Sequence, residues 1–496
     1  MSRLTAGLVV LAAMARLLFL DWKPVHYDEG INGYFVNQLW LKGFAEYDPA
    51  NYHGPLYFYY LQLAEIVFGR GIVAFRFATA LLSCATVTLA ALHARYIGRA
   101  AYWAAAILAV SPAFVFYGRY AIHESLLILF QVCFTWGFLA WHDERSRRGW
   151  VAMLAGVFGS IATKETFFIF FGCWFIALAL VRLPAIRLPA KVVTPEAERT
   201  ADDIPSVSWR LSVAVGMAMA TLALYSGFLL DPSGVVDMFR ALTAWTQTGT
   251  GASPHAKPFA YWLELLLHYE WPLLSGLTLA CLYSLAGSRW MRLFAATGFG
   301  LWLAYSLIPY KTPWLVIGLW PLAFAAGFLA VEIRRPPLRR AMQALLVGCL
   351  AVSAVAMLRL NFRNYANPVE QYVYVQSTTD LNVIMDTIEG RVERAPEDQA
   401  MPIRVWVRDT WPLPWLLSLY PDVGYGTFSP GMNVDGAVVL LDASERQAFE
   451  AALRAPYLRM PFHLRDAYSP GFAYFEQARF ATLLPAGATV VGPTAP

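Results

Sequence analysis

Two adjacent carboxylates follow the first apolar segment of the sequence, in the run His26-Tyr27-Asp28-Glu29-Gly30. A carboxylate near a membrane surface can act as a general base, and a second one beside it can orient a substrate or bind a metal ion. The acidic flank of a helix is a common alternative that involves no chemistry. We take Asp28 and Glu29 as catalytic candidates.

A second polar group lies between two apolar segments, in the run Tyr117-Gly118-Arg119-Tyr120-Ala121-Ile122-His123-Glu124. The planar guanidinium of Arg119 suits a phosphate. Glu124 would occupy the first turn of a helix, where the dipole alone favours a carboxylate. An Arg, a His and a Glu within six residues between two apolar segments favour a functional role over this purely structural one. Glu124 is therefore a further catalytic candidate, and Arg119, Tyr120 and His123 are candidates for substrate binding.

Three more polar turns follow the same pattern of apolar segments and turns. The first combines His53 with tyrosines around a Pro- and Gly-rich turn. The second contains Lys164 and Glu165, and the third contains Tyr310 and Lys311. Each turn also has an explanation without substrate binding: an aromatic belt at the membrane interface for the first, a solvated turn for the second, and a lysine that snorkels to the interface for the third. The candidates for substrate binding from these turns are His53, Tyr57, Lys164, Glu165, Tyr310 and Lys311.

The elements that position these residues are apolar segments, and a membrane-spanning helix needs about 20 apolar residues. Eleven segments are candidates: 4–20, 74–94, 100–117, 124–141, 150–163, 166–181, 211–230, 260–286, 291–308, 313–331 and 341–358. The run Gly54–Gly69 is ambiguous. If it lies in the membrane plane, the clusters of Lys and Arg all fall on one side, as cytoplasmic loops require. We therefore predict a cytoplasmic N-terminus and a long first outer loop, 21–73, with in-plane helices.

The composition agrees with a lipid environment. Hydrophobic residues make up 58% of the 496 and charged residues 15%, whereas soluble chains carry about 25% charged residues. The basic residues lie in short clusters between apolar runs, which predicts no nucleic-acid partner. The five cysteines lie inside apolar runs without metal-ligand or redox spacing. The sequence thus predicts a multi-pass protein of the plasma membrane, with residues 1–359 as its transmembrane domain.

Residues 360–496 contain charges and prolines and no candidate span. The segments 403–407 and 437–441 have the pattern of buried strands, and 411–420 and 444–454 that of helices. We expect a small α/β domain on the extracytoplasmic side.

In this topology the acidic residues of the first two outer loops and the basic residues of the second, third and fifth face one aqueous compartment. This arrangement suits the transfer of a group from a phosphorylated donor held in the bilayer. The carboxylate would deprotonate an acceptor hydroxyl, and the basic residues would stabilise the departing phosphate.

The order of these motifs resembles the GT-C glycosyltransferases, in particular the protein mannosyltransferase and aminoarabinose transferase branch. The stretches HYDEGINGYF, DPANYHGPLYFYYL, GRYAIHESL, ATKETF and YKTPWL most closely resemble the flippase-activity-associated membrane proteins of archaeal-type N-glycosylation loci, which include bacterial members. The resemblance covers roughly residues 5–330 and is weak over the tail.

The resemblance implies inverting transfer of a sugar from a polyprenyl-phosphate donor to a glycan, lipid or protein acceptor on the outer face. Asp28 matches the GT-C aspartate that acts as base or metal ligand. Glu124 matches a second acidic position that is usually Asp in the mannosyltransferase branch, so its reach differs. Arg119 and Lys164 match positions near the donor phosphate. Some GT-C enzymes use a divalent cation, which Asp28 and Glu124 would hold here.

Two other classes of function remain open. A non-catalytic, flippase-associated protein would use the same residues to bind lipid-linked sugars or help them cross the membrane. An ion-coupled transporter would carry charges deep inside several spans and show repeat symmetry between its halves. The charges here are expected at the outer helix ends and no repeat is visible, which disfavours a transporter.

Overall fold

The computed structural model describes residues 2–182, 204–251, 254–429, 438–465, 470–483 and 488–493, together with positions 431, 432, 434 and 436. Most of the basic stretch 182–210 lies outside the described residues. Contacts divide the chain into two compact units. Unit 1 comprises Met1–Leu20 and Gln38–Asn364, and unit 2 comprises Asp21–Asn37 and Tyr365–Pro496. The segment that follows the first helix therefore folds with the C-terminal part of the chain.

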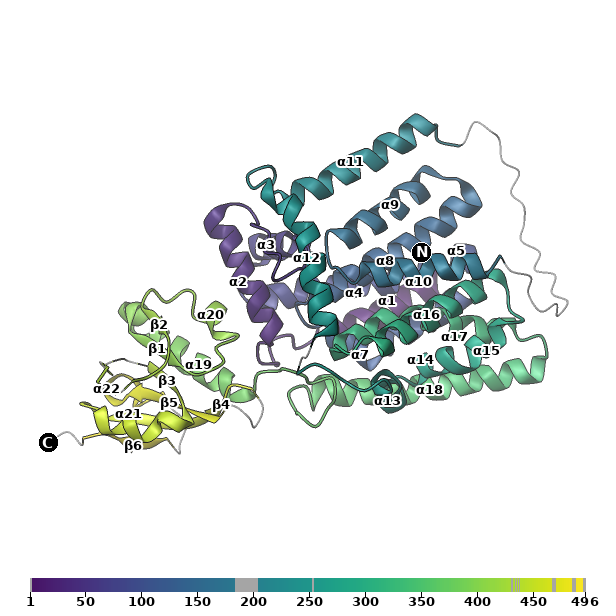
Figure 1. Cartoon of the computed structure of the whole chain (residues 1–496). Helices are drawn as coiled ribbons and strands as arrows, with labels where there is room; N and C mark the ends of the chain where they lie inside the picture. Colours follow the sequence, from purple (N-terminus) through teal and green to yellow (C-terminus); the bar gives the residue numbers. More distant parts are fainter. Residues whose placement is uncertain are drawn as a thin grey trace. The chain divides into compact units, whose positions relative to one another are not determined.

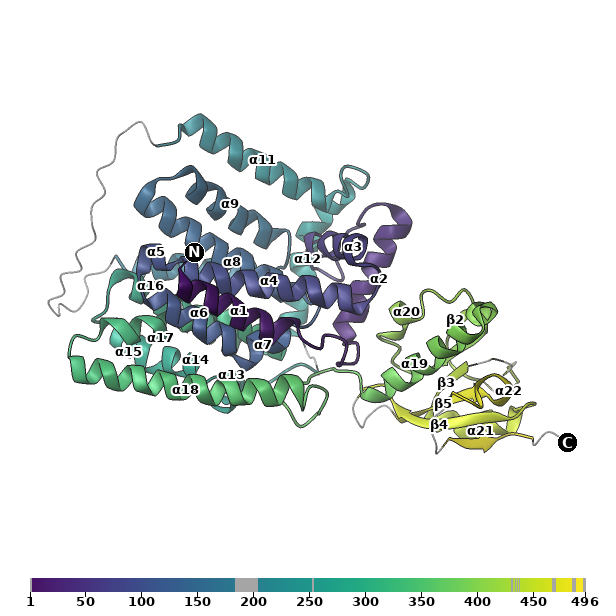
Figure 2. The same ribbon diagram turned by 180° about the vertical axis from the view of Figure 1, so that it is seen from behind.

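Unit 1 is helical, and α8 lies against α9 in both views (Figures 1 and 2). Its helices are α1 (Arg3–Leu17), α3 (Leu56–Phe68), α4 (Ile72–Leu92), α5 (Ala94–Ile97), α6 (Ala100–Val110), α7 (Pro112–Tyr117), α8 (His123–Glu144), α9 (Arg147–Ile161), α10 (Phe167–Leu180), α11 (Val207–Tyr225), α12 (Ser233–Thr250), α13 (Tyr261–Tyr269), α14 (Trp271–Ser275), α15 (Cys281–Ser284), α16 (Arg289–Leu307), α17 (Pro321–Glu332) and α18 (Pro336–Phe362). A π-helical turn, Gly276–Ala280, joins α14 to α15, and a 3-10 helix, Pro313–Leu319, precedes α17.

Four helical stretches of the described chain are long and apolar enough to cross a membrane: Ile72–Ile97, His123–Glu144, Val207–Tyr225 and Pro336–Phe362. Two bent pairs raise the number to six if each counts as one span: Tyr261–Tyr269 with Trp271–Ser284, and Pro313–Leu319 with Pro321–Glu332. All eleven expected segments are helical, but several of their helices are shorter than a span. The chain is a multi-pass membrane protein, and the number eleven stays a prediction.

The ambiguous run Gly54–Gly69 forms α3, which has 13 residues. At about 1.5 Å per residue such a helix is roughly 20 Å long, which is shorter than a hydrocarbon core of about 30 Å. Gly69 ends it with a positive φ of 86° and donates its amide to the Glu65 carbonyl, a backbone conformation that favours glycine. Helices α6 and α10, which lie in expected spans, are of similar length, and the in-plane placement of α3 stays a prediction.

Unit 2 contains a six-stranded mixed sheet in the order β2-β1-β3-β5-β4-β6. Strand β1 pairs in parallel with β2 and β3, and the remaining pairs are antiparallel. The strands are β1 (Ile403–Trp406), β2 (Val423–Tyr425), β3 (Val438–Asp442), β4 (Tyr457–His463), β5 (Pro470–Glu476) and β6 (Thr489–Val491). The helices are α19 (Thr379–Arg394), α20 (Leu413–Leu416), α21 (Arg446–Ala452) and α22 (Gln477–Phe480), and α2 (Tyr27–Lys42) starts in this unit.

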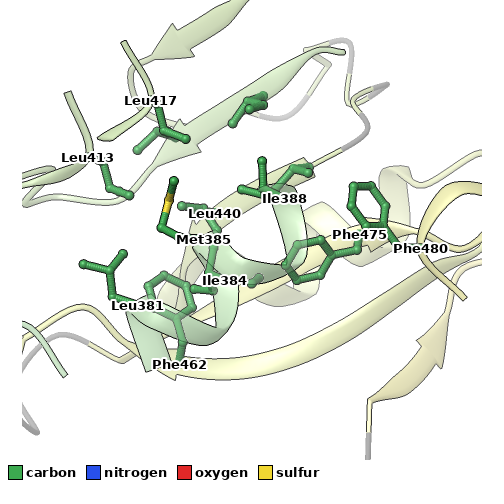
Figure 3. Packing of buried hydrophobic residues seen from close by; sticks show 14 of the residues in the cluster. Leu381, Ile384, Met385, Ile388, Leu413, Leu417, Leu440, Phe462, Phe475 and Phe480 are labelled. Carbon is green, nitrogen blue, oxygen red and sulfur yellow. The ribbon is translucent and has the colours of Figure 1, made fainter. Parts of the chain in front are cut away.

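Helices cover both faces of this sheet. On one face α19 packs its Leu381, Ile384 and Ile388 against Leu440 and Phe475 (Figure 3). On the other face Phe449 of α21 packs among residues of the alternate register, such as Val439 and Tyr474. A strand buried on both faces reads as a continuous apolar run, which is why the segments 403–407 and 437–441 could be recognised as strands in the sequence.

Replacing Ile384 with alanine should destabilise unit 2 by about 2–5 kcal/mol, because the side chain is fully buried and its removal leaves a cavity. Hydrogen exchange of the full-length protein in nanodiscs measures the loss as faster exchange across β1 and β3. Val383→Ala, at the exposed neighbouring position, is the matched control and should leave exchange unchanged. Equal effects of the two substitutions would contradict this packing.

Candidate functional site

The carboxylates Asp28 and Glu29 lie in the first turn of α2 and have different surroundings. The Gly30 amide donates to the His26 carbonyl oxygen at 3.0 Å, so His26 is the N-cap of the helix. Glu29 is fully buried, and its Oε2 accepts the His26 amide at 2.9 Å. The His26 Nδ1 in turn accepts the Asp28 amide at 3.1 Å. This is a reciprocal capping arrangement with histidine as the capping residue.

Of the two carboxylates, only Asp28 is partly exposed. Glu29 uses an oxygen to cap its own helix. Asp28 is the carboxylate of the pair that is open to solvent, and the catalytic roles of both residues stay predictions.

Unit 1 gathers predicted site residues from three separate turns into one group, which we call the polar cluster: the partly exposed His53 and the buried His123, Glu124, Lys164 and Glu165. The Lys164 ammonium lies 2.5 Å from Glu124 Oε1, with side-chain exposures of only 7% and 4%. His53 Nδ1 lies 3.0 Å from Glu165 Oε2. The His123 ring stands between its neighbours, with centroid distances of 4.6 Å to His53 and to Tyr57.

Backbone hydrogen bonds bring the turns of the polar cluster together. The amide of Gly54 donates to the Thr163 carbonyl at 3.0 Å, and the amide of Leu56 donates to the Ala162 carbonyl at 3.1 Å. A Cβ on Gly54 would stand 2.2 Å from the Ala162 carbonyl oxygen, so only glycine allows this approach. The Tyr57 hydroxyl lies 2.7 Å from Thr79 Oγ1, which fixes the start of α3 against α4.

The charges of the polar cluster are mutually stabilised. Burial alone would lower the pKa of Lys164, but the carboxylates of Glu124 and Glu165 outweigh it, and the pKa lies above its ordinary value. Burial alone would raise the pKa of Glu165, but the His53 ring and the Lys164 ammonium outweigh it, and the pKa lies below its ordinary value. Both groups are therefore charged at neutral pH.

One polar atom of the polar cluster has no hydrogen-bond partner within the described part of the chain. It is Nε2 of His123, which is buried. Buried polar atoms are nearly always hydrogen-bonded, and an exception calls for an explanation such as a ligand or water.

Arg119 and Arg16 each donate to backbone carbonyls at the end of a helix. Arg119 is 1% exposed and donates to the carbonyls of Ala15 (3.2 Å) and Phe19 (2.9 Å) at the end of α1, with its guanidinium 4.7 Å from the Phe362 ring. Arg16 donates to the carbonyls of Leu108 (2.8 Å) and Ala109 (3.0 Å) at the end of α6. These bonds cap a helix, and the contact of Arg119 with phosphate stays a prediction.

The break between α6 and α7 has a second charged cap, Glu270. Its carboxylate accepts the Ser111 hydroxyl at 2.7 Å and the Ala113 amide at 2.8 Å. Pro112 removes one amide from the junction, so the last carbonyls of α6 and the first amides of α7 need outside partners. Arg16 and Glu270 provide them with the charges that the two helix dipoles favour, and they support the turn that leads to Arg119.

Sequence reasoning missed both residues, although each is a charge inside an apolar run, which is itself a signal. The expectation that charges stand at outer helix ends fits Arg16, which lies in the last turn of α1, but not Glu270, which lies between α13 and α14 within the expected span 260–286. Both side chains are fully buried and are hydrogen-bonded to backbone groups at helix ends. Their burial is therefore explained without a pathway of charges through the membrane, as a transporter would have.

The remaining candidates lie in two other places. Lys311 is buried, and its ammonium donates to the carbonyls of Lys257 (3.2 Å) and Ile308. The Tyr310 ring packs on His255 at 5.1 Å. Tyr120 is buried against Phe116, with ring centroids 5.0 Å apart. The role of these three side chains in substrate binding stays a prediction.

The donor set of the polar cluster does not fit a divalent cation. Across the described residues, no three side chains of His, Cys, Asp or Glu are grouped so that they could hold a metal ion. Glu124, one of the two expected ligands, would have to give up Lys164 as its partner, and Glu165 would have to give up His53. We derive no step through a metal.

Similarity to known proteins bears on the fold. Residues 50–196 match the family model described as dolichyl-phosphate-mannose-protein mannosyltransferase. No curated protein sequence matches this chain.

Among solved structures, the chain is similar to ArnT from Cupriavidus metallidurans bound to undecaprenyl phosphate, with a TM-score of 0.60 and 15% identity over 97% of this chain and 98% of ArnT. Apo ArnT gives a TM-score of 0.61 at 13% identity, again over 97% of this chain and 98% of ArnT. The oligosaccharyltransferase of Archaeoglobus fulgidus, in complex with zinc and sulfate, gives 0.51 at 14% identity over 98% of this chain and 74% of that one. These similarities establish the GT-C membrane fold that the sequence predicts. The finer resemblance to flippase-associated proteins stays a prediction.

Removing one partner of the buried pair should cost more stability than removing both. Lys164→Met leaves the Glu124 carboxylate buried without its cation, which should destabilise unit 1 by about 3–5 kcal/mol. Adding Glu124→Gln should recover most of this loss. Thermal unfolding of the purified protein in detergent measures both.

The surface pair Lys42–Glu46 is the control, since its side chains are 43% and 56% exposed. Lys42→Met should cost less than about 1 kcal/mol. A loss for Lys164→Met as small as this, or a double variant less stable than the single one, would contradict the pairing.

Proposed function

We propose that this chain is an integral membrane glycosyltransferase that transfers a sugar from a polyprenyl-phosphate-linked donor to an acceptor on the extracytoplasmic side. The observation that carries the proposal is the polar cluster: a buried lysine, two histidines and two carboxylates converge from three turns around an unpartnered imidazole nitrogen. The GT-C fold and the mannosyltransferase model over residues 50–196 support it. ArnT, which has a similar structure, has been seen with undecaprenyl phosphate bound. This supports a polyprenyl phosphate as the lipid of the donor.

In the proposed reaction, the acceptor hydroxyl attacks the anomeric carbon of the sugar, and its proton passes to the Asp28 carboxylate. The new carbon–oxygen bond forms on the face opposite the phosphate, so the configuration inverts. The bond between the anomeric carbon and the phosphate oxygen breaks, and polyprenyl phosphate leaves with the additional negative charge. Asp28 suits the role of base because it is the partly exposed carboxylate of its pair.

The polar cluster would bind the donor phosphate. Lys164 carries a positive charge in a buried place, where an electrostatic interaction is stronger than in water, and His123 Nε2 has an open hydrogen-bonding position. Phosphate binding would share the Lys164 ammonium between Glu124 and the phosphate. A fixed cation aimed at the leaving group lowers the barrier as charge develops there.

The proposal includes a plasma-membrane location with a cytoplasmic N-terminus and extracytoplasmic residues 360–496. The acceptor is a hydroxyl-bearing glycan, lipid or protein. The orientation rests on the positive-inside distribution of Lys and Arg.

A second candidate function is a non-catalytic protein that binds lipid-linked sugars or helps them cross the membrane. The observation that favours it is the pairing of Glu124 with Lys164, because this pairing occupies a carboxylate that the sequence suggests as catalytic. The two functions differ in one result: the purified protein with donor and acceptor alone transfers sugar only if the first is correct.

Asp28→Asn should lower kcat by about 10²–10⁴-fold, because it removes the base and keeps the shape of the side chain. The assay is transfer from polyprenyl-phosphate-linked sugars to a panel of acceptors by the full-length protein in liposomes. Donor binding should be unchanged.

Two variants make this test specific. Asp21→Asn lies in the same segment at an exposed position and should keep full activity. Glu29→Gln keeps an oxygen that can accept the His26 amide. Its fold-loss of activity should therefore be at least ten times smaller than that of Asp28→Asn. Wild-type activity of Asp28→Asn would eliminate Asp28 as the base, and binding without any transfer by the wild-type protein would favour the second function.

A further inference from the structure

His26 connects the first turn of α2 to residues about 350 positions later in the chain. Its Nε2 lies 2.9 Å from the Tyr374 carbonyl oxygen, and its backbone forms an antiparallel bridge with Gln376. The Gln376 side chain donates to the Pro24 carbonyl at 2.9 Å. These contacts lie within unit 2. They involve the ring and backbone of His26, which caps the helix that contains Asp28, and the backbone of Pro24 just before it.

The partners of the His26 ring fix its tautomer. A carbonyl oxygen only accepts, so Nε2 carries the hydrogen and donates it to Tyr374. Nδ1 carries none, because it accepts the Asp28 amide at 3.1 Å. One imidazole ring thus joins the Asp28 backbone to the C-terminal part of the chain.

The same segment has two further attachments in unit 2. The Arg465 guanidinium lies 4.6 Å from the Tyr27 ring and forms an ion pair with Asp409. A Cβ on Gly33 of α2 would lie 2.3 Å from the Trp415 ring, so α2 packs closely on α20. The first turns of α2 are therefore held by several separate segments of residues 365–496.

We propose that His26 is a positioning residue for Asp28, and that the C-terminal part of the chain serves the reaction by holding His26. The proposal rests on the proposed function, in which Asp28 is the base. The amide at the second helical position has no partner within its own helix, so the His26 ring decides how the first turn sits. A displacement of about 1 Å at a reacting group can reduce a rate about 10²-fold.

Two substitutions separate the helix cap from the link to Tyr374. His26→Phe keeps a ring but removes both hydrogen bonds, and should lower kcat about 100-fold. His26→Asn provides an oxygen that can still accept the Asp28 amide, as asparagine does at helix N-caps, but cannot reach the Tyr374 carbonyl. It should lower kcat about tenfold. In both variants the KM for the polyprenyl-phosphate-linked donor should stay within about twofold, because positioning the base is not expected to affect donor binding.

The matched control is His463→Gln. His463 lies in the same unit with a half-exposed side chain near Asp380, and its substitution should leave kcat unchanged. Wild-type kcat in His26→Asn would show that the link to Tyr374 is dispensable and would overturn the proposal. A rise in donor KM that accounts for the whole loss would overturn it as well.

A measurement without catalysis keeps this proposal separate from the proposed function. Hydrogen exchange of the full-length protein should show the Asp28 amide exchanging at least tenfold faster in His26→Phe than in the wild-type chain. If the wild-type protein transfers no sugar, the proposed function fails and the positioning contact is still tested. Unchanged exchange at Asp28 in His26→Phe would overturn the proposal in either case.

Discussion

The buried ion pair between Lys164 and Glu124 is the constraint on which the functional account depends. Two charges removed from water are tolerated only when each has a partner at close range, and here the partners come from turns 40 positions apart in the sequence. The pair therefore fixes the turn after α9 against the start of α8. His53 and Glu165 extend the same arrangement to the turn before α3. Polar turns that are scattered along the sequence become one group because none of them can be buried alone.

Buried charges elsewhere in unit 1 are satisfied in a different way. Arg16, Arg119 and Glu270 bind the open ends of helices, where carbonyls or amides lack partners within the helix. Such residues shape the protein around the polar cluster, whereas the charged side chains of the polar cluster pair with one another. This difference separates structural charges from those proposed to bind phosphate, although the sequence presents all of them as charges among apolar residues.

The sequence predicted well those features that depend on local pattern. Strands β1 and β3 were recognisable because both faces of the sheet are covered, and the GT-C fold was recognisable from short motifs in order. His53, Lys164 and Glu124 were identified as candidates because polar residues beside apolar runs are costly. Tertiary partners could not be predicted: nothing local indicates that Arg119 caps α1, or that residues 21–37 fold with the C-terminal part. The number of membrane spans also depends on breaks in helices, such as the break at Pro112. Hydropathy averaged over many residues does not show such breaks.

The central claim is that the polar cluster binds the phosphate of a lipid-linked sugar. The most direct measurement is a structure of the full-length protein in lipid with polyprenyl phosphate bound. The account predicts a phosphate oxygen within hydrogen-bond distance of the Lys164 ammonium and of His123 Nε2, with the contact between Lys164 and Glu124 lengthened. A phosphate bound elsewhere, with the polar cluster unchanged, would contradict it.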